Sequence, residues 1–186
     1  MFFLEIISIP VNTIYNKEAL VIEGIPSTID IELTGSKSRI NKLKDNNSLY
    51  VTLDLSPYID KLGKHTIEYT FTNPNPKVDC KLLNKRAKVT IYEKVSSRYE
   101  IINLVYIDKE NIHNKIINKD IIVRGSQKEI DKIAKIEATL NTSTTTDYNN
   151  IPLIAYDKDG NKLSTIEIVP STITEEYFTS NYTHIN

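Results

Sequence analysis

Apolar and polar residues alternate one by one along most of this chain. Residues 29–34, 51–56, 67–72 and 136–141 each carry an apolar side chain at every second position. Successive side chains of a β-strand point to opposite faces, so each stretch is predicted to be a strand with one buried and one solvated face. This alternation favours antiparallel sheets over parallel sheets buried on both sides. We therefore predict an all-β fold with mostly antiparallel sheets.

Two short segments depart from the alternation. In residues 36–43 and 126–133 the apolar side chains are three positions apart, which places them on one face of a helical turn. Ser126 and Glu129 fit a capping box, and Ser36 can cap the first helix without a reciprocal partner. Each predicted helix has about two turns, too few to be stable alone. We expect each to dock its apolar pair onto a sheet.

The two predicted helices belong to an internal repeat. Gly35-Ser36 and Gly125-Ser126 precede them at an offset of 90 (125 − 35). After the helices, residues 53–56 match residues 140–143 at an offset of 87 (140 − 53). A match in the same order through a strand, a glycine, a helix and a second strand indicates two copies of one structural unit.

The repeat divides the chain into two expected domains, residues 1–95 and 96–186, with a hinge near residues 95–98. Each domain has about 90 residues, which is enough to fold without disulfides. The motif Pro-Ser-Thr-Ile occurs at residues 26–29 and again at residues 170–173. We expect each proline to open an alternating strand, where its missing amide does little harm.

Residues 157–161, Asp-Lys-Asp-Gly-Asn, lie between two apolar stretches. They predict a hairpin turn in which Gly160 takes a positive φ. A calcium loop is the alternative, but the further acidic ligands and the closing glutamate of an EF-hand are missing.

Composition narrows the functional classes. The chain has 23 basic and 24 acidic residues, so it lacks the charge excess expected for binding nucleic acid or anionic lipid. Hydrophobic residues make up 40% of the sequence, which supports a packed core. No stretch approaches the roughly 18–20 apolar residues of a membrane span. The apolar opening at residues 1–7 is interrupted by Glu5 and is predicted to be a first strand, not a signal peptide.

Few residues suggest chemistry. The single cysteine, Cys80, has the register of a core-facing strand residue, and burial would make it inert. The histidines His65, His113 and His184 lie far apart in sequence and form no metal pair on one element. We expect them to be turn or surface residues, and we expect no glycine-rich phosphate loop. The sequence thus predicts no catalytic, cofactor-binding or metal-ligating residue and singles out no binding residue.

Two other features remain open. The triplets at residues 141–143 and 181–183 match the N-glycosylation pattern, which is common by chance and has no meaning in a bacterial protein. Eleven tyrosines could provide an aromatic partner surface, although many, such as Tyr69, fit core positions.

The order of these motifs resembles the YbbR-like domain family. The resemblance rests on Leu-Thr-Gly-Ser-Lys-Ser at residues 33–38, Val-Thr-Leu-Asp-Leu-Ser at 51–56 and Leu-Gly-Lys-His-Thr-Ile-Glu at 62–68. The second copy contributes Val-Arg-Gly-Ser-Gln at residues 123–127 and Val-Pro-Ser-Thr-Ile-Thr at 169–174. It departs at residues 142–147, Thr-Ser-Thr-Thr-Thr-Asp, and has no match to Pro26 before Gly125.

The resemblance implies two tandem YbbR-like domains, each with one short helix. Domains of this family occur in series after an N-terminal membrane helix, outside the cytoplasmic membrane. The whole protein is associated with the membrane diadenylate cyclase that makes cyclic di-AMP, and it modulates that enzyme. This chain, in which such a helix is absent, is then expected to be a non-catalytic extracytoplasmic fragment without a cofactor. Its partner would be the cyclase complex, and an unknown extracellular ligand is a further expectation.

Two other functions remain as alternatives. One is a structural spacer or adhesin-like module on the cell surface, which would also explain tandem β-units without an active site. The other is an enzyme whose site forms between the two copies. A nucleic-acid role is disfavoured by the balanced charge.

Overall fold

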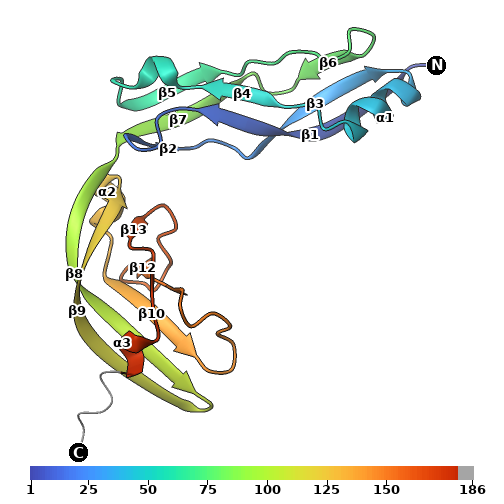
Figure 1. Cartoon of the computed structure of the whole chain (residues 1–186). Coiled ribbons are helices and arrows are strands. Elements are labelled where there is room, and N and C mark those ends of the chain that lie inside the picture. The colour runs from blue at the N-terminus through green and yellow to red at the C-terminus, as the bar shows by residue number, and fades with distance from the viewer. Residues whose placement is uncertain (180–186) are drawn as a thin grey trace, which may run out of the picture. The chain divides into compact units, whose positions relative to one another are not determined.

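The computed structural model describes residues 1–179, which separate into two compact units (Figure 1). The first unit is Met1–Tyr92 and the second begins at Glu93. Residues 95–98, expected near a hinge, begin strand β8 of the second unit and pair with strand β9. The boundary between the two compact units lies between Tyr92 and Glu93, close to the expected one.

The first unit contains two sheets and one helix. The four-stranded sheet has the order β4-β1-β3-β6, and the three-stranded sheet has the order β2-β7-β5. Its elements are β1 (Phe3–Ile14), β2 (Leu20–Glu23), β3 (Thr28–Gly35), α1 (Lys37–Asp45), β4 (Val51–Asp54), the 3-10 turn η1 (Ser56–Tyr58), β5 (Gly63–Glu68), β6 (Asp79–Leu82) and β7 (Arg86–Glu93).

The second unit has a five-stranded sheet of order β12-β10-β8-β9-β13 and a small sheet of β11 with β14. Its elements are β8 (Val95–Asp108), β9 (Asn111–Gly125), α2 (Gln127–Ile130), β10 (Lys135–Asn141), β11 (Ile151–Pro152), β12 (Ile154–Tyr156), β13 (Glu167–Val169), β14 (Thr172–Ile173) and α3 (Glu176–Thr179).

The two units share a sequence of connections. In each, a long strand (β1 or β8) pairs antiparallel with a later strand (β3 or β9). A short helix follows (α1 or α2), and the next strand (β4 or β10) runs parallel to the long strand. The later strands β6 and β13 each add antiparallel to the outer side of the second strand, at Leu33↔Cys80 and Val123↔Ile168. These pairs are equivalent, since Leu33 and Val123 each lie two residues before the repeat glycine. The prediction of mostly antiparallel β-structure is confirmed, and β1–β4 and β8–β10 are parallel pairs.

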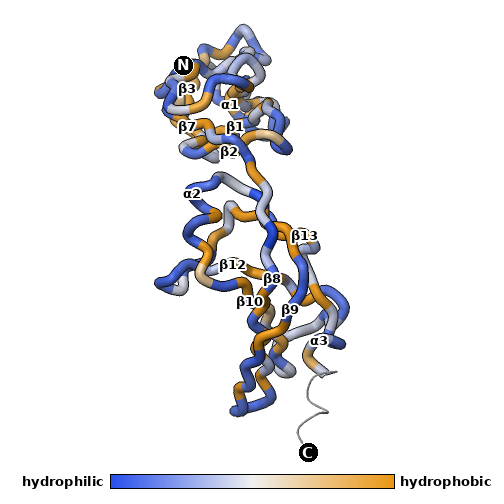
Figure 2. Tube along the Cα trace, turned by 90° about the vertical axis from the view of Figure 1, so that its left-hand side faces the viewer, coloured by the Kyte–Doolittle hydropathy of each residue, from blue (hydrophilic) through white to orange (hydrophobic). Residues whose placement is uncertain are grey.

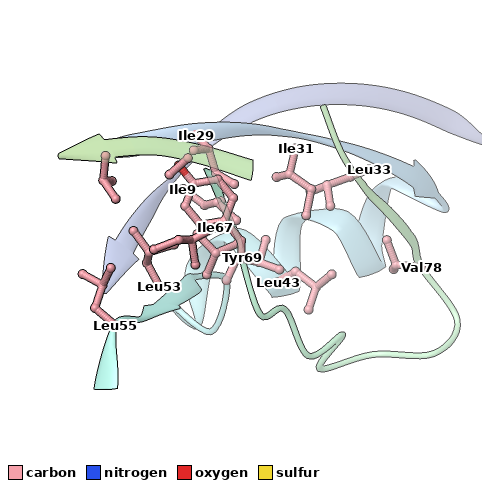
Figure 3. Packing of buried hydrophobic residues seen from close by; sticks show 14 of the residues in the cluster. Ile9, Ile29, Ile31, Leu33, Leu43, Leu53, Leu55, Ile67, Tyr69 and Val78 are labelled. Carbon is pink, nitrogen blue, oxygen red and sulfur yellow. The ribbon is translucent and has the colours of Figure 1, made fainter. Parts of the chain in front are cut away.

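The alternation predicted from the sequence places the core correctly. Ile31, Leu33 and Leu53 are completely buried, and Ile136 and Ala138 are buried in the second unit. Figure 3 shows side chains of β1, β3 and β4 in the first unit gathered with Leu43 of α1, Ile67 and Tyr69. Each unit has its own cluster of buried aliphatic residues. Such burial is the main favourable contribution to folding.

The helices dock as expected but differ in length. Ile40 and Leu43 of α1 are buried, as is Ile130 of α2. Helix α2 has a single turn rather than the two that were predicted, and non-helical turns follow it. The prediction that Ser36 caps α1 through its side chain is wrong, because Ser36 occupies the N-cap position without a side-chain cap hydrogen bond.

The connection between the first two strands differs between the units. In the first unit it includes β2 and Pro26, whereas β8 and β9 join in a direct hairpin. Lys109 makes that turn with a φ of 54°. The second copy therefore has no counterpart of Pro26 because it lacks the whole connecting segment that contains β2.

A β-bulge interrupts the β8–β9 ribbon. Tyr99 pairs with Ile121 and Ile101 pairs with Asn118, so one residue of β8, Glu100, lies opposite two residues of β9. The bulge shifts the alternation of β8: Ile102 is buried, whereas Ile101 is 51% exposed. Strict alternation from the core-facing Tyr99 would have buried Ile101. Along β8 and β9 the colouring of Figure 2 switches repeatedly between hydrophobic and hydrophilic.

Candidate functional site

The two described histidines take part in local contacts. His65 is in β5, with Nε2 2.7 Å from the Lys61 carbonyl oxygen and its ring edge-on to Tyr58 at 5.0 Å between centroids. His113 is on β9 and stacks on Tyr106 at 6.1 Å. His65 belongs to the first unit and His113 to the second. His184 lies outside the described residues, as does the triplet 181–183.

The turn at residues 157–161 is a hairpin turn, as predicted. Gly160 has a φ of 82°, and the Asp157 carboxylate accepts hydrogen bonds from the Asp159 and Asn161 amides at 2.9 and 2.8 Å. The hydrogen bond from the Asn161 amide is the main cause that lowers the pKa of Asp157. Within residues 1–179, no group of three or more His, Cys, Asp or Glu side chains is arranged to hold a metal ion. This carboxylate therefore serves to shape the turn.

Cys80 lies on β6, half-buried against the first core. Burial raises the pKa of its thiol, and the nearby charge of Asp79 raises it further. A thiol with a raised pKa is a poor nucleophile, because the thiolate is the reactive form. This environment agrees with the core-facing position predicted from the sequence.

The repeat glycines occupy equivalent places in the two units. Gly35 ends β3 and Gly125 ends β9, and each is followed by the serine that opens the helix. A Cβ at Gly35 would lie 3.4 Å from Val78 Cγ2, and one at Gly125 would lie 3.0 Å from Ile166 Cδ1. In both units a later segment packs against this turn, but only at Gly125 would a Cβ be tighter than an ordinary van der Waals contact.

Of the two serines that follow these glycines, only Ser126 provides a side-chain cap. Its hydroxyl oxygen accepts the Glu129 amide at 3.2 Å, which confirms one half of the predicted capping box. The Glu129 carboxylate contacts Lys132 at 2.7 Å and Thr165 at 3.4 Å. It thus links α2 to the segment before β13.

The outward face of the five-stranded sheet in the second unit carries an exposed ion pair and a hollow beside it. Arg98 donates to both carboxylate oxygens of Asp120 at 2.8 Å and lies 3.3 Å from Glu100. The hydrogen bond to Asp120 raises the pKa of Arg98. A hollow of about 450 Å³ next to this pair is lined by Ile122 and Val169. Sequence reasoning missed this surface, because its form depends on strand pairing and the bulge.

None of the helices within residues 1–179 has both the length and the apolar character required to cross a membrane. The longest of them, α1, has nine residues.

Comparison with known proteins agrees with the architecture. Residues 7–91 match the model of a family described as YbbR-like protein. The chain is 26% identical over 174 residues to a Bacillus subtilis (strain 168) protein named CdaA regulatory protein CdaR; the match covers 89% of this chain and 35% of that protein. The chain therefore spans about a third of the length of this relative.

Two solved structures are similar. A YbbR-like protein from Streptococcus pneumoniae TIGR4 has a TM-score of 0.68 and 21% identity, covering 92% of this chain and 91% of that one. A YbbR-like domain from Listeria monocytogenes has a TM-score of 0.44 and 26% identity, covering 50% of this chain and 96% of that one. The first likeness shows a shared fold over nearly the whole chain. Residues 7–91, which make up most of the first unit, thus form a YbbR-like domain, and the chain as a whole is a distant homologue of CdaR.

Proposed function

We propose that this chain is a non-catalytic extracytoplasmic region of a membrane-anchored protein that binds and modulates a membrane diadenylate cyclase. The observation that carries the proposal is the 26% identity to a CdaA regulatory protein, which extends over 89% of the chain. The chain would then influence the production of cyclic di-AMP through contact with the cyclase complex or with a ligand outside the membrane.

The proposal includes two YbbR-like domains, residues 1–95 and 96–186. The family match supports the first of them. The second is supported by its equivalent strand connections, by the Gly125-Ser126 turn that corresponds to Gly35-Ser36, and by the docking of Ile130 in the place of Ile40.

The environment of the reactive side chains supports the non-catalytic part of the proposal. The cysteine thiol has a raised pKa, the histidines His65 and His113 contact neighbouring aromatic rings, and Asp157 is occupied by backbone amides. Catalysis by a nucleophile and base requires those groups to converge within hydrogen-bond reach.

The test is made in cells with the full-length protein. The region that corresponds to this chain is deleted, the amount of cyclase is held constant, and cyclic di-AMP is measured. We expect the cyclic di-AMP level to change and the full-length protein to co-purify with the cyclase. An unchanged level after deletion would contradict the proposal.

A replacement control separates regulation from spacing. An unrelated pair of β-domains of similar size is inserted in place of the deleted region. If regulation depends on specific contacts, this replacement should fail to restore the cyclic di-AMP level of the wild type. Full restoration would instead identify the region as a spacer.

A further inference from the structure

Two lysines and two threonines share the outward face of the β5–β7 strand pair in the first unit. Lys64 of β5 lies opposite Thr90 of β7, and Thr66 lies opposite Lys88. Val89, between Lys88 and Thr90, is 3% exposed and belongs to the core. Because side chains alternate along a strand, the two lysines and two threonines point away from that core. We call these four residues the Lys/Thr cluster.

The Lys/Thr cluster lines a hollow. The hollow has a volume of about 410 Å³, and His65 and Val89 complete its lining, so none of the described lining residues carries a carboxylate. In the strand register the lysines lie on one diagonal and the threonines on the other. Diagonal neighbours on one face of an antiparallel pair are about 7–8 Å apart, so two long lysine side chains are able to converge on one small ligand.

The donors of the Lys/Thr cluster have no partner in the part of the chain that the structure describes. Among residues 1–179, Lys64 and Lys88 form no ion pair, and the hydroxyls of Thr66 and Thr90 form no hydrogen bond. Two ammonium groups on one face repel each other when no negative charge lies between them. An anion in the hollow would relieve this repulsion.

The acidic side chains beside the cluster already have partners. Glu68, the next outward residue of β5, is paired with Arg86 at 2.9 Å. On strand β2, which adjoins β7, the Glu23 carboxylate accepts the Tyr92 hydroxyl at 3.2 Å. Neither contact involves a lysine of the cluster, so both ammonium charges remain available to a ligand.

We propose that the Lys/Thr cluster binds a phosphate group, either free or as a monoester of a small molecule. The oxygens of a phosphate dianion accept hydrogen bonds, and the cluster provides two ammonium and two hydroxyl donors for them. Lysine binds phosphate as a point charge, whereas a planar carboxylate is matched best by the fork of an arginine. The two positive charges of the cluster equal the charge of the dianion.

The site is open to solvent, which sets the expected affinity. Lys64, Thr66 and Lys88 are exposed, and Thr90 is half-buried. Because exposed charge pairs contribute little in water, we expect a dissociation constant of about 1–10 mM for inorganic phosphate. The site rests on the surface of the first unit alone and does not depend on the proposed regulation of the cyclase.

The experiment is a titration of the isotope-labelled whole chain, residues 1–186, followed by the amide chemical shifts in nuclear magnetic resonance spectra. Sodium phosphate is added at about pH 8, where the dianion predominates, and sodium chloride keeps the ionic strength constant. We expect saturable shifts confined to the amides of β5 and β7. A parallel titration with glycerol 3-phosphate distinguishes the two sources: tighter binding identifies an esterified phosphate as the ligand, and equal binding identifies the phosphate group itself.

Substitutions locate the binding to the cluster. Lys64→Gln and Lys88→Gln should each weaken phosphate binding about fivefold or more, because each removes one charged donor. Lys81→Gln is the matched control: Lys81 is exposed on β6 of the same unit but does not line the hollow, and its substitution should leave the affinity unchanged. Circular dichroism and thermal unfolding establish that each variant is folded.

Three results would overturn the proposal. The first is the absence of saturable shifts up to about 50 mM phosphate. The second is a set of shifts spread over surface lysines throughout the chain. The third is an equal loss of affinity in the Lys81→Gln control, which would show that phosphate responds only to the total charge.

Discussion

Asp54 and Asn141 occupy the same place in the two units. Each ends the strand that runs parallel to the first strand of its unit, and each side chain accepts the backbone amide two residues later: Ser56 N at 2.9 Å and Ser143 N at 3.0 Å from the respective Oδ1. The second copy lacks the Asp-Leu-Ser sequence, yet its asparagine makes the same kind of turn. An amide oxygen and a carboxylate oxygen are equivalent here as acceptors.

This equivalence leads to a prediction for Asp54→Asn. The Ser56 hydroxyl and amide lower the pKa of Asp54 below the usual aspartate value. A lowered pKa in the folded state stabilises the protein above the unfolded-state pKa, and this contribution is lost as pH falls through the folded value. The D54N variant keeps the acceptor oxygen but does not titrate. Urea unfolding from about pH 5 to about pH 2 should show wild type losing more stability than D54N. Parallel pH profiles of the two proteins would contradict this.

Gly24 and Gly63 provide a matched pair for backbone strain. Both have a positive φ, 92° and 98°, which costs free energy for any residue with a Cβ. A Cβ at Gly24 would lie 2.6 Å from the Lys88 carbonyl oxygen, whereas at Gly63 nothing lies within 4 Å. Gly63→Ala should reduce the free energy of unfolding by about 1–2 kcal/mol. Gly24→Ala should reduce it by about 3 kcal/mol or more, because a backbone clash is added. Equal losses in denaturant unfolding would show that the contact with Lys88 is unimportant.

The buried hydroxyl of Tyr69 predicts a stabilising substitution. Tyr69 is 8% exposed, and its hydroxyl has no hydrogen-bond partner among residues 1–179. Removing a buried polar group without a partner should favour the folded state. Tyr69→Phe is expected to raise the free energy of unfolding by about 1 kcal/mol. Tyr99→Phe is the control, because the Tyr99 hydroxyl donates to the Ile133 carbonyl at 3.4 Å; its free energy of unfolding should stay equal or fall. A destabilised Y69F protein would argue that the hydroxyl has a partner.

Leu53 and Leu140 test whether each unit has its own stability. Both are buried, at 0% and 2% exposure, and each belongs to the core cluster of a different unit. Substitution of either by alanine should lower the free energy of unfolding of its own unit by about 2–4 kcal/mol. Hydrogen exchange with mass spectrometry should show faster exchange only in the unit that carries the substitution. Faster exchange throughout the chain after either substitution would indicate a single cooperative core.

Features set by neighbouring residues were predictable from the sequence. The alternation identified the buried residues of β3 and β4, because side chains of a strand alternate between its two faces and the apolar set marks the buried face. The three-residue spacing identified both docking helices, and Gly160 marked its turn. These features depend on local chemistry and on side-chain periodicity.

Features set by distant pairing were not predictable in the same way. Nothing in residues 51–54 shows that β4 runs parallel to β1, because the alternating pattern is the same for either direction. The sequence around Glu100 has no glycine that would mark a bulge, so the exposure of Ile101 follows only from its pairing with Asn118.

At the irregular pairing around Glu100, the side chains of β8 that face solvent can change while the buried core of the second unit stays the same. Upstream of it, odd-numbered residues of β8 face inward; downstream, even-numbered residues do. Insertion or removal of one residue at such a point exchanges the set of side chains displayed to solvent over the rest of the strand. Members of a tandem array built on one scaffold are thereby able to present different surfaces without redesign of the fold.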